Sequence, residues 1–351
     1  MIVIDGIFFT RTMTGVQRVA NCLVRELDRI AEPGQFQLLI PAFCPVPEGF
    51  TRIEVVRFGH CRGYLWEQVD LALYLARHRA VGLFFENAVP VLYRRGVTYL
   101  HDISMRVNPE FWRTGCRGRI SECLWRIMYR AIMDSEMQMV TVSAFSRSEI
   151  SRVYGVPEAR IAVIPCGWQH MNNIEADPGV LERLHLERRG YFFAMATAAA
   201  NKNQDWILRA AAANPQECFV IAGKGTERLM GTVPANLRCI GYVSDREAKA
   251  LMGHCRAFLF PSLYEGFGLP PLEALASGAE YVVVSDIPVL REVYGDAAVY
   301  VDPRTTWQVP DRESEQIPGA EVRAALLGRY SWAGSAEQLL RLCEREDGRK
   351  V

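Results

Sequence analysis

The sequence predicts an α/β fold built from two doubly wound parallel sheets. Short apolar runs with strand character alternate with helical patterns along the whole chain, which is typical of parallel sheets covered by helices. The chain has 351 residues, 50% of them hydrophobic, enough for two domains that each bury a core. The polar stretch Gln169–Pro178 is expected to link them. We therefore predict one domain over residues 1–175, a second over residues 176–328, and a C-terminal segment over residues 329–351.

The apolar runs that we expect to form strands fall into two sets. Those of the first half are Ile2–Ile4, Gln37–Ile40, Arg52–Val56, Leu83–Phe85, Thr98–Leu100, Gln138–Val142 and Ile161–Ile164. Those of the second half are Tyr191–Ala196, Cys218–Ala222, Leu237–Ile240, Ala257–Phe260, Tyr281–Val284 and Ala298–Val301. Open α/β sheets bind ligands at the carboxyl ends of their strands, so the residues after each run are the first candidates for a site.

Helical patterns fill the intervals between these runs. Val16–Ile30 and Gly118–Asp134 carry apolar residues at helical spacing. Ser244 and Glu247 have the spacing of a capping box, so a helix is expected to begin there. Ser331–Cys343 is predicted to be an amphipathic helix near the end of the chain.

The composition excludes several classes of protein. The 40 basic residues balance the 40 acidic ones, whereas nucleic-acid binders usually carry a basic excess. The ten cysteines include no C-x-x-C pair, which favours reduced thiols over a disulfide framework. The N-terminus begins as a strand and not as a signal peptide, and no apolar run approaches the roughly 20 residues that span a bilayer. We expect a cytoplasmic protein, soluble or attached peripherally at the inner membrane face.

The stretch Glu265–Glu273 is the most informative motif. It follows the apolar run Ala257–Phe260, contains Gly266 and Gly268, and continues as a short helix with Pro270 expected at its first position. A helix N-terminus carries free N–H groups and a partial positive charge, so it attracts phosphate. The two glutamates add acceptors for hydroxyl groups, and phosphate together with a polyol describes a nucleotide sugar. The alternative is a tight turn with solvated glutamates.

The same stretch resembles the donor-site signature of the family 4 retaining glycosyltransferases, the E-x7-E enzymes of the two-domain GT-B fold. The resemblance implies that Glu265 holds hydroxyls of the donor sugar and Glu273 the ribose. It also implies a metal-free diphosphate site that includes the backbone amides of Gly266, Phe267, Gly268 and Leu269. No cofactor besides the nucleotide sugar is implied. In this family the C-terminal helix packs back towards the first domain.

A second motif, Tyr191–Asn203, supplies a cation. Lys202 is one of only four lysines, and a lysine in a loop before a helix is a good point charge for a diphosphate. The segment resembles the family's G-S-L-x-x-R-K-N pattern, in which Lys202 falls on the diphosphate-binding lysine and Thr197 lies near the phosphates. Asn201 replaces the arginine of that pattern, so Lys224 is a candidate for the second cation. The alternative is a solvated surface lysine. Tyr242 completes the donor-binding candidates.

The third motif is His101 followed by Asp102, directly after an apolar run. A single His-Asp pair is also common in protein cores, where the carboxylate bonds the ring. By resemblance to the family, His101 binds the donor sugar from the first domain and assists catalysis together with Lys202 and Glu265. Asp102 is then expected to orient the ring of His101.

Two further segments resemble family loops. Residues 12–19 look like the G-G-I-x-R-Y loop, in which Gly15 lets the backbone approach the donor or acceptor closely, while Arg18 fits a site role and a scaffold role equally. Residues 141–150 resemble the V-S-x-F-S segment, whose Ser and Thr residues we expect to cap a helix, so that the segment is mainly scaffold, with Ser143 as a candidate for an acceptor-side contact.

The helix Gly118–Asp134 carries one apolar stripe, formed by Ile120, Cys123, Leu124, Ile127, Met128 and Ala131. Arg117, Arg119, Arg126 and Arg130 lie mostly off this stripe. A basic amphipathic helix of this kind can lie on an anionic membrane. We favour the other interpretation, a surface helix whose apolar stripe faces the core.

The predicted function is retaining transfer of a hexose from a nucleoside-diphosphate sugar to a glycan or lipid-linked oligosaccharide in polysaccharide biosynthesis. Residues 14–18 together with 101–104 resemble the corresponding segments of bacterial surface-polysaccharide mannosyltransferases. This resemblance favours GDP-mannose as the donor and a peripheral contact of the protein with the cytoplasmic membrane face. No nucleic-acid partner is expected. Two alternatives stay open, a sugar-nucleotide epimerase and a non-catalytic subunit of a glycan assembly complex.

Overall fold

The computed structural model describes residues 1–112, 115–197, 199–226, 233–310 and 317–348, with the backbone alone for 115–121. The chain divides into two compact units. The first comprises Met1–Pro109, Arg113–Gly167 and Ser331–Val351, and the second comprises Glu110–Trp112 and Trp168–Tyr330. Apart from the short segment Glu110–Trp112, the chain passes from the first unit to the second after Gly167 and returns after Tyr330, whereas the sequence predicts boundaries at residues 175 and 328.

The first unit is built on a seven-stranded parallel sheet with the strand order β3-β2-β1-β4-β5-β6-β7. Its strands are β1 (Ile2–Asp5), β2 (Phe36–Pro41), β3 (Glu54–Phe58), β4 (Val81–Phe84), β5 (Gly96–Tyr99), β6 (Gln138–Thr141) and β7 (Ile161–Val163). Each overlaps one predicted run. Most of their side chains are buried, as expected of strands covered by helices on both faces.

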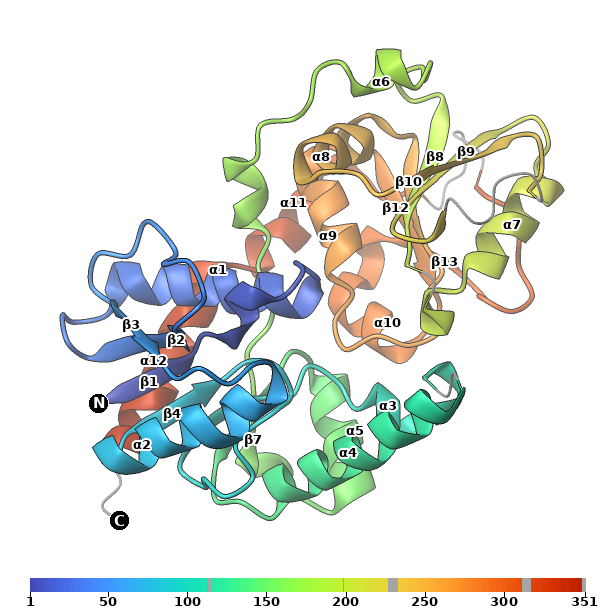
Figure 1. Ribbon diagram of the computed structural model, residues 1–351. Helices are drawn as coiled ribbons and strands as arrows, with labels where there is room; N and C mark the ends of the chain where they lie inside the picture. Colours follow the sequence, from blue (N-terminus) through green and yellow to red (C-terminus); the bar gives the residue numbers. More distant parts are fainter. Residues whose placement is uncertain (113–114, 198, 227–232, 311–316, 349–351) are drawn as a thin grey trace. The chain divides into compact units, whose positions relative to one another are not determined.

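Six α-helices belong to this unit in the part that the structure describes. They are α1 (Gly15–Ile30), α2 (Ala72–His78), α3 (Ser104–Val107), α4 (Gly115–Met133), α5 (Ala144–Tyr154) and α12 (Trp332–Gly348). Figure 1 shows α12, coloured red, alongside α1 and the strands β4 and β5, although it comes from the other end of the chain. It docks through one buried stripe at helical spacing, formed by Trp332, Ala336, Leu339 and Cys343.

Asp28 ties α1 to the loop before β3. Its carboxylate accepts hydrogen bonds from the backbone amides of Thr51, Arg52 and Ile53 and from the Thr51 hydroxyl, at 2.7–3.1 Å. The carboxylate thus supplies the hydrogen-bond acceptors that these three consecutive amides would otherwise find in a helix or a sheet.

The second unit contains a six-stranded parallel sheet with the order β10-β9-β8-β11-β12-β13. Its strands are β8 (Tyr191–Met195), β9 (Cys218–Ala222), β10 (Leu237–Gly241), β11 (Ala257–Phe260), β12 (Tyr281–Ser285) and β13 (Val299–Val301). Its α-helices in the described residues are α6 (Val180–Arg183), α7 (Gln204–Ala213), α8 (Asp245–His254), α9 (Leu269–Ser277), α10 (Pro288–Tyr294) and α11 (Ala320–Arg329). The capping box predicted for Ser244 and Glu247 is present at the start of α8.

The two sheets share one topological feature that locates their ligand sites. In each sheet the first strand is central: the next two strands of the chain, β2 and β3 or β9 and β10, lie on one side of it. The strand after these pairs with its other side, so that β4 lies beside β1 and β11 lies beside β8. The loops after these paired strands leave in opposite directions and open a crevice at the carboxyl ends. The sites therefore belong beyond β1 and β4 in the first unit and beyond β8 and β11 in the second.

The expected linker Gln169–Pro178 is not a free connection. Residues Gln169–Asn173 form a short 3-10 helix within the second unit. Its backbone is held by Lys249, whose Nζ donates to the carbonyls of Met171 and Ile174 at 2.7 Å each. Polar composition indicated a linker, but the polar groups here are hydrogen-bonded to the domain.

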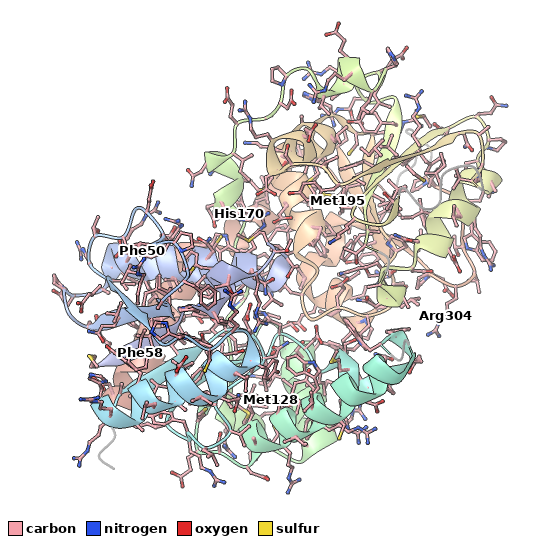
Figure 2. All side chains as sticks on the ribbon, viewed as in Figure 1. Phe50, Phe58, Met128, His170, Met195 and Arg304 are labelled. Carbon is pink, nitrogen blue, oxygen red and sulfur yellow. The ribbon has the colours of Figure 1, made fainter. Side chains whose placement is uncertain are left out.

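The favoured interpretation of the helix 118–134, an apolar stripe that faces the core, is wrong for three residues of the stripe. Leu124 is 58% and Ile127 is 54% exposed, and Cys123 is exposed as well. The core side of α4 instead contains Met128, labelled in Figure 2, together with Tyr129, Ile132 and Met133. The helix is apolar on more than one side, so periodicity alone did not tell which side packs. The side chains of Arg117, Arg119 and Ile120 lie outside the described residues.

The nine cysteines whose side chains are described are free thiols. Cys116 lies among the residues described by backbone alone. None of the helices in the described ranges combines the length and apolarity that a membrane span requires.

Candidate active site

The crevice of the second unit is formed by the loops after β8 and β11, and asparagines hold these loops together. Asn201 is buried. Its backbone carbonyl accepts from the Leu263 amide at 2.8 Å, and its side-chain Nδ2 donates to the Tyr264 backbone carbonyl at 3.3 Å. Asn203 adopts a left-handed conformation (φ +50°) and donates from Nδ2 to the carbonyls of Pro261 and Pro303, both at 3.0 Å. Residue 202 therefore occupies a defined position opposite residue 265.

Lys202 and Glu265 form an ion pair in this crevice. The Lys202 Nζ lies 2.5 Å from Glu265 Oε1 and 5.4 Å from the centre of the Phe260 ring. Both side chains are partly buried, so solvent screens their charges less than at the open surface. The structure thus brings together two of the three residues predicted to be catalytic, a cation suited to phosphate and a carboxylate suited to hydroxyl groups.

The glycine loop leads into α9, and its two larger side chains, Phe267 and Leu269, are buried. Gly268 has φ +86°, and a Cβ there would lie 2.5 Å from Leu290 Cδ2, so only glycine fits without displacement. Phe267 packs edge to face on Tyr330, with ring centres 5.3 Å apart, and Leu269 is buried. The candidate contribution of Gly266–Leu269 is therefore made by backbone amides.

The start of α9 differs in one respect from the sequence prediction. The helix begins at Leu269, so Pro270 occupies its second position and Pro271 its third. Neither proline has an N–H group, which removes two of the four donors that a helix N-terminus normally offers. Phosphate recognition at this end would rest on the loop amides before the prolines and on Lys202.

Glu273 lies in the middle of α9 and is paired with His170. The His170 Nε2 lies 2.8 Å from Glu273 Oε1, and the two side chains are 11% and 12% exposed. The sequence analysis did not identify His170, which precedes Glu273 by more than one hundred residues.

The other donor candidates lie at the same carboxyl edge. Thr197 is exposed, and its carbonyl accepts from Gln204 Nε2 at 3.0 Å. Lys224 is exposed and follows Gly223, whose backbone contacts Ala196 so closely that a Cβ would lie 2.1 Å from the Ala196 carbonyl oxygen. Tyr242, 75% exposed, follows the edge strand β10. Their roles in donor binding stay predictions.

His101 follows β5 at the carboxyl edge of the first sheet. Its ring is buried and stacks on Tyr99, and its Nε2 donates to the Phe85 carbonyl at 2.7 Å. Burial lowers the pKa of His101 to about 4, so the ring is neutral at physiological pH. The Nε2 partner is thus a backbone carbonyl, whereas the Asp102 Oδ1 accepts from the Ser104 amide at 2.8 Å. Asn87 holds the loop by accepting from the His101 amide at 2.8 Å.

The crevice beside β1 and β4 contains a buried polar network that the sequence analysis missed. Arg11 lies 3.0 Å from Glu67 Oε2 and 2.7 Å from Glu86 Oε2, and Gln17 donates to Glu86. Burial raises the pKa values of Glu67 and of Asp5, which ends β1. The position of Glu86 directly after an apolar run was the signal available in the sequence.

This network flanks the loop that leads to α1. Thr14 donates to Gln17 and provides the N-cap position of the helix. Gly15 is exposed, and no described atom lies within 4 Å of where its Cβ would stand. Packing against the described residues therefore gives no reason for glycine there, and the expected approach of Gly15 to the donor or acceptor stays a prediction. Ser143 caps α5 by accepting from the Ser146 amide at 3.0 Å, which confirms that a Ser or Thr of this segment caps a helix; its contact with an acceptor stays a prediction.

Within the described ranges, no group of three or more His, Cys, Asp and Glu side chains is arranged to hold a metal ion. The expectation that the reaction needs no metal stays a prediction.

Comparison with known proteins decides the family. A model described as "Glycosyl transferases group 1" matches residues 182–317. An O-antigen chain mannosyltransferase B of Escherichia coli is 33% identical over 270 residues, which cover 72% of this chain and 67% of that protein. The chain belongs to the group 1 glycosyltransferases. The predicted glycosyltransferase activity is confirmed at this level.

Other relatives agree with this assignment. The O-antigen chain mannosyltransferase RfbU of Salmonella typhimurium is 27% identical over 249 residues, covering 68% of this chain and 65% of that protein. The chain thus spans about two thirds of the length of these two relatives.

Solved structures confirm the GT-B fold. A sucrose-phosphate synthase from Thermosynechococcus elongatus superimposes with a TM-score of 0.72 at 14% identity, over 98% of both chains. Anabaena HepE in complex with UDP-glucose gives a TM-score of 0.70 at 15% identity, over 98% of this chain and 99% of that one. At such identities the likeness concerns the fold alone.

Proposed function

We propose that this glycosyltransferase moves a mannosyl group from GDP-mannose to a glycan or lipid-linked oligosaccharide in surface-polysaccharide synthesis, with retention at the anomeric carbon. The observation that supports the proposal is the Lys202–Glu265 pair beside the Gly266–Leu269 loop, because a lysine suits a phosphate and a carboxylate suits sugar hydroxyl groups. The names of the O-antigen mannosyltransferases favour mannose as the sugar.

Donor binding exchanges the partners of this pair. In the described structure Lys202 and Glu265 neutralise each other at 2.5 Å. The diphosphate of the donor takes the place of Glu265 as counterion of Lys202, and the freed carboxylate accepts hydroxyl groups of the sugar. Lys202 keeps an anionic partner in this exchange, while the hydroxyl groups of the sugar replace Lys202 as hydrogen-bond donors to Glu265.

The chemical step requires stabilisation of negative charge on the departing diphosphate. Lys202, the loop amides and the Thr197 hydroxyl would supply it without a metal ion. The bond from C1 to the diphosphate oxygen breaks while the acceptor oxygen bonds C1 on the same face, and the acceptor proton passes to the departing diphosphate. No cofactor takes part in this scheme.

His101 suits a transition state with positive charge on the sugar because its ring is neutral. A buried imidazolium would oppose an oxocarbenium-like centre, whereas burial here keeps the proton off the ring. Its Nε2–H is already engaged by the Phe85 carbonyl, so a contact with the sugar would use Nδ1 as an acceptor.

The donor proposal is tested by calorimetry of GDP, UDP and their common sugar conjugates. We expect GDP and GDP-mannose to bind in the micromolar range, and Glu273→Ala to weaken both at least tenfold. Glu321→Ala, which changes an exposed glutamate on α11, is the control and should bind like the wild type. A folded wild type that binds no nucleotide would refute the donor site, and selective binding of UDP would refute the guanine base.

We further propose that the first unit contacts an anionic membrane. Leu65, Val69 and Leu73 are exposed at four-residue spacing along the helical segment that leads into α2. Tyr64, at the start of that segment, makes an edge contact with Trp125 of α4, next to the exposed residues Leu124 and Ile127. We call these five exposed aliphatic residues the apolar surface.

Charge favours an anionic lipid surface as the occupant. The first lysine of the chain is residue 202, so the side-chain cations of residues 1–167, histidines aside, are arginines. Among them Arg77, Arg126 and Arg130 are exposed on the elements that carry the apolar surface, and Arg62 is exposed in the loop before the first of these elements; Arg126 and Arg130 each also pair with a carboxylate four residues away. Apolar side chains flanked by cations are typical of proteins that lie in the membrane interface.

Cosedimentation with vesicles tests this contact. We expect binding to vesicles that contain phosphatidylglycerol, weaker binding to pure phosphatidylcholine, and a loss of at least tenfold for the double variant Leu124→Ser and Ile127→Ser. Val322→Ser, which changes an exposed aliphatic side chain on α11, serves as the control. Equal binding by the double variant and the wild type would refute the apolar surface as the contact.

A further inference from the structure

The hydrogen bond between His170 and Glu273 joins the donor-site motif to a segment outside that motif. Glu273 belongs to the E-x7-E motif on α9, whereas His170 belongs to the segment that follows the chain crossing at Gly167. The Nε2 to Oε1 distance is 2.8 Å and both side chains are nearly buried, so this hydrogen bond is shielded from competing water.

The segment that carries His170 is fixed to the second unit on both sides of the histidine. Before it, Trp168 Nε1 donates to the Leu327 carbonyl at 2.8 Å, and Gln169 Nε2 donates to the Tyr330 carbonyl at 2.9 Å. After it, Lys249 Nζ donates to two backbone carbonyls of the segment at 2.7 Å each, and the Met171 side chain is buried. His170, labelled in Figure 2, therefore belongs to a backbone segment that several independent hydrogen bonds hold in place.

We infer that His170 is a positioning residue that fixes the carboxylate of Glu273 for the ribose hydroxyls of the donor. The inference rests on the proposed function, in which Glu273 binds the ribose. A glutamate side chain loses rotamer freedom when it binds a ligand, and a residue that has already removed this freedom improves affinity. A carboxylate has about four acceptor positions, so the bond to His170 leaves room for ribose hydroxyls on the same group.

The contrast with the other glutamate of the motif clarifies the role. The Lys202–Glu265 pair has to open when the diphosphate arrives, because the phosphate needs Lys202. The His170–Glu273 pair has no such competitor, since a ribose is neutral and offers hydroxyl donors. Glu265 is thus paired with Lys202 until the donor binds, whereas Glu273 is aligned for the ribose before the donor binds.

The test compares affinities for GDP and 2′,3′-dideoxy-GDP, because only the ribose hydroxyls distinguish these two ligands. For the wild type we expect GDP to bind more tightly, and for Glu273→Ala we expect this preference to disappear. His170→Ala should lower the preference for GDP about tenfold while affinity for the dideoxy ligand stays unchanged. His170→Gln, whose Nε2 can replace the imidazole Nε2 as donor, should restore most of the preference.

The controls separate the inference from the proposed function. His60→Ala changes an exposed histidine of the first unit and should leave both affinities unchanged. Equal losses for both ligands in His170→Ala, or an unchanged preference, would overturn the positioning role while leaving the donor site intact. Absence of any preference in the wild type would overturn ribose binding by Glu273 and the positioning role with it.

Discussion

Protonation of His101 should destabilise the first unit by about 3 kcal/mol. Burial lowers the pKa of this histidine from 6.5 to about 4, and each pKa unit corresponds to about 1.4 kcal/mol of difference between the two protonation states. The unfolded chain therefore binds more protons than the folded one between about pH 4 and pH 6.5. The contribution of His101 therefore makes the free energy of unfolding rise with pH across this window, and this contribution is lost as the pH falls from about 6.5 to about 4.

The assay is urea unfolding of the wild type and of His101→Gln at intervals between pH 4 and pH 7.5. Burial also raises the pKa values of Asp5 and Glu67, which gives a slope of opposite sign in both proteins. The difference between wild type and variant isolates His101, and this difference should change by about 3 kcal/mol between pH 7 and pH 4. His60→Gln, at an exposed position, should follow the wild type throughout.

Nuclear magnetic resonance of the six histidine rings gives the same quantity directly. The Cε1 proton of His101 should show no titration above about pH 5. A His101 resonance that titrates near pH 6.5, or a stability difference that is constant with pH, would refute the view that burial keeps this ring neutral.

Three further predictions concern single side chains. Asp28→Ala should lower the free energy of unfolding, measured by urea titration, by about 3 kcal/mol, because it leaves the amides of one turn without acceptors. As a control, Asp134→Ala removes the exposed Arg130–Asp134 ion pair and should lower the free energy of unfolding by less than about 0.5 kcal/mol. Gly268→Ala should cost about 2 kcal/mol or more and weaken nucleotide binding in calorimetry, because a Cβ at φ +86° meets Leu290, and wild-type stability would contradict this. Lys202→Gln should lower kcat/KM for sugar transfer about 100-fold, corresponding to about 2.7 kcal/mol, whereas a loss below about threefold would remove Lys202 from the diphosphate site.

The fold could be predicted from the sequence because each of its strands is short, apolar and bounded by polar loops. In parallel sheets covered on both faces, a strand is a continuous apolar run and does not depend on knowing which face is buried. The same information does not decide how a helix with two apolar sides packs. On α4, Leu124 and Met128 are neighbours in one stripe, yet the first is exposed and the second is buried.

The candidate site could be predicted where its residues follow strands of the same sheet. Lys202 and Glu265 each follow a central strand, and neighbouring parallel strands end at the same edge, so their pairing follows from topology. His170 could not be found this way because it lies in a segment without periodicity. Its contact with Glu273 depends on how that segment folds back onto α9, which only the three-dimensional structure shows.

The stereochemistry of the product tests the central claim most directly. Purified protein would be incubated with GDP-α-mannose and a lipid-linked oligosaccharide, and the anomeric configuration of the new bond would be read by nuclear magnetic resonance while GDP release is measured. The account predicts an α-mannoside and one GDP for each bond formed. A β-mannoside, or GDP-mannose left intact while another nucleotide sugar is consumed, would contradict it.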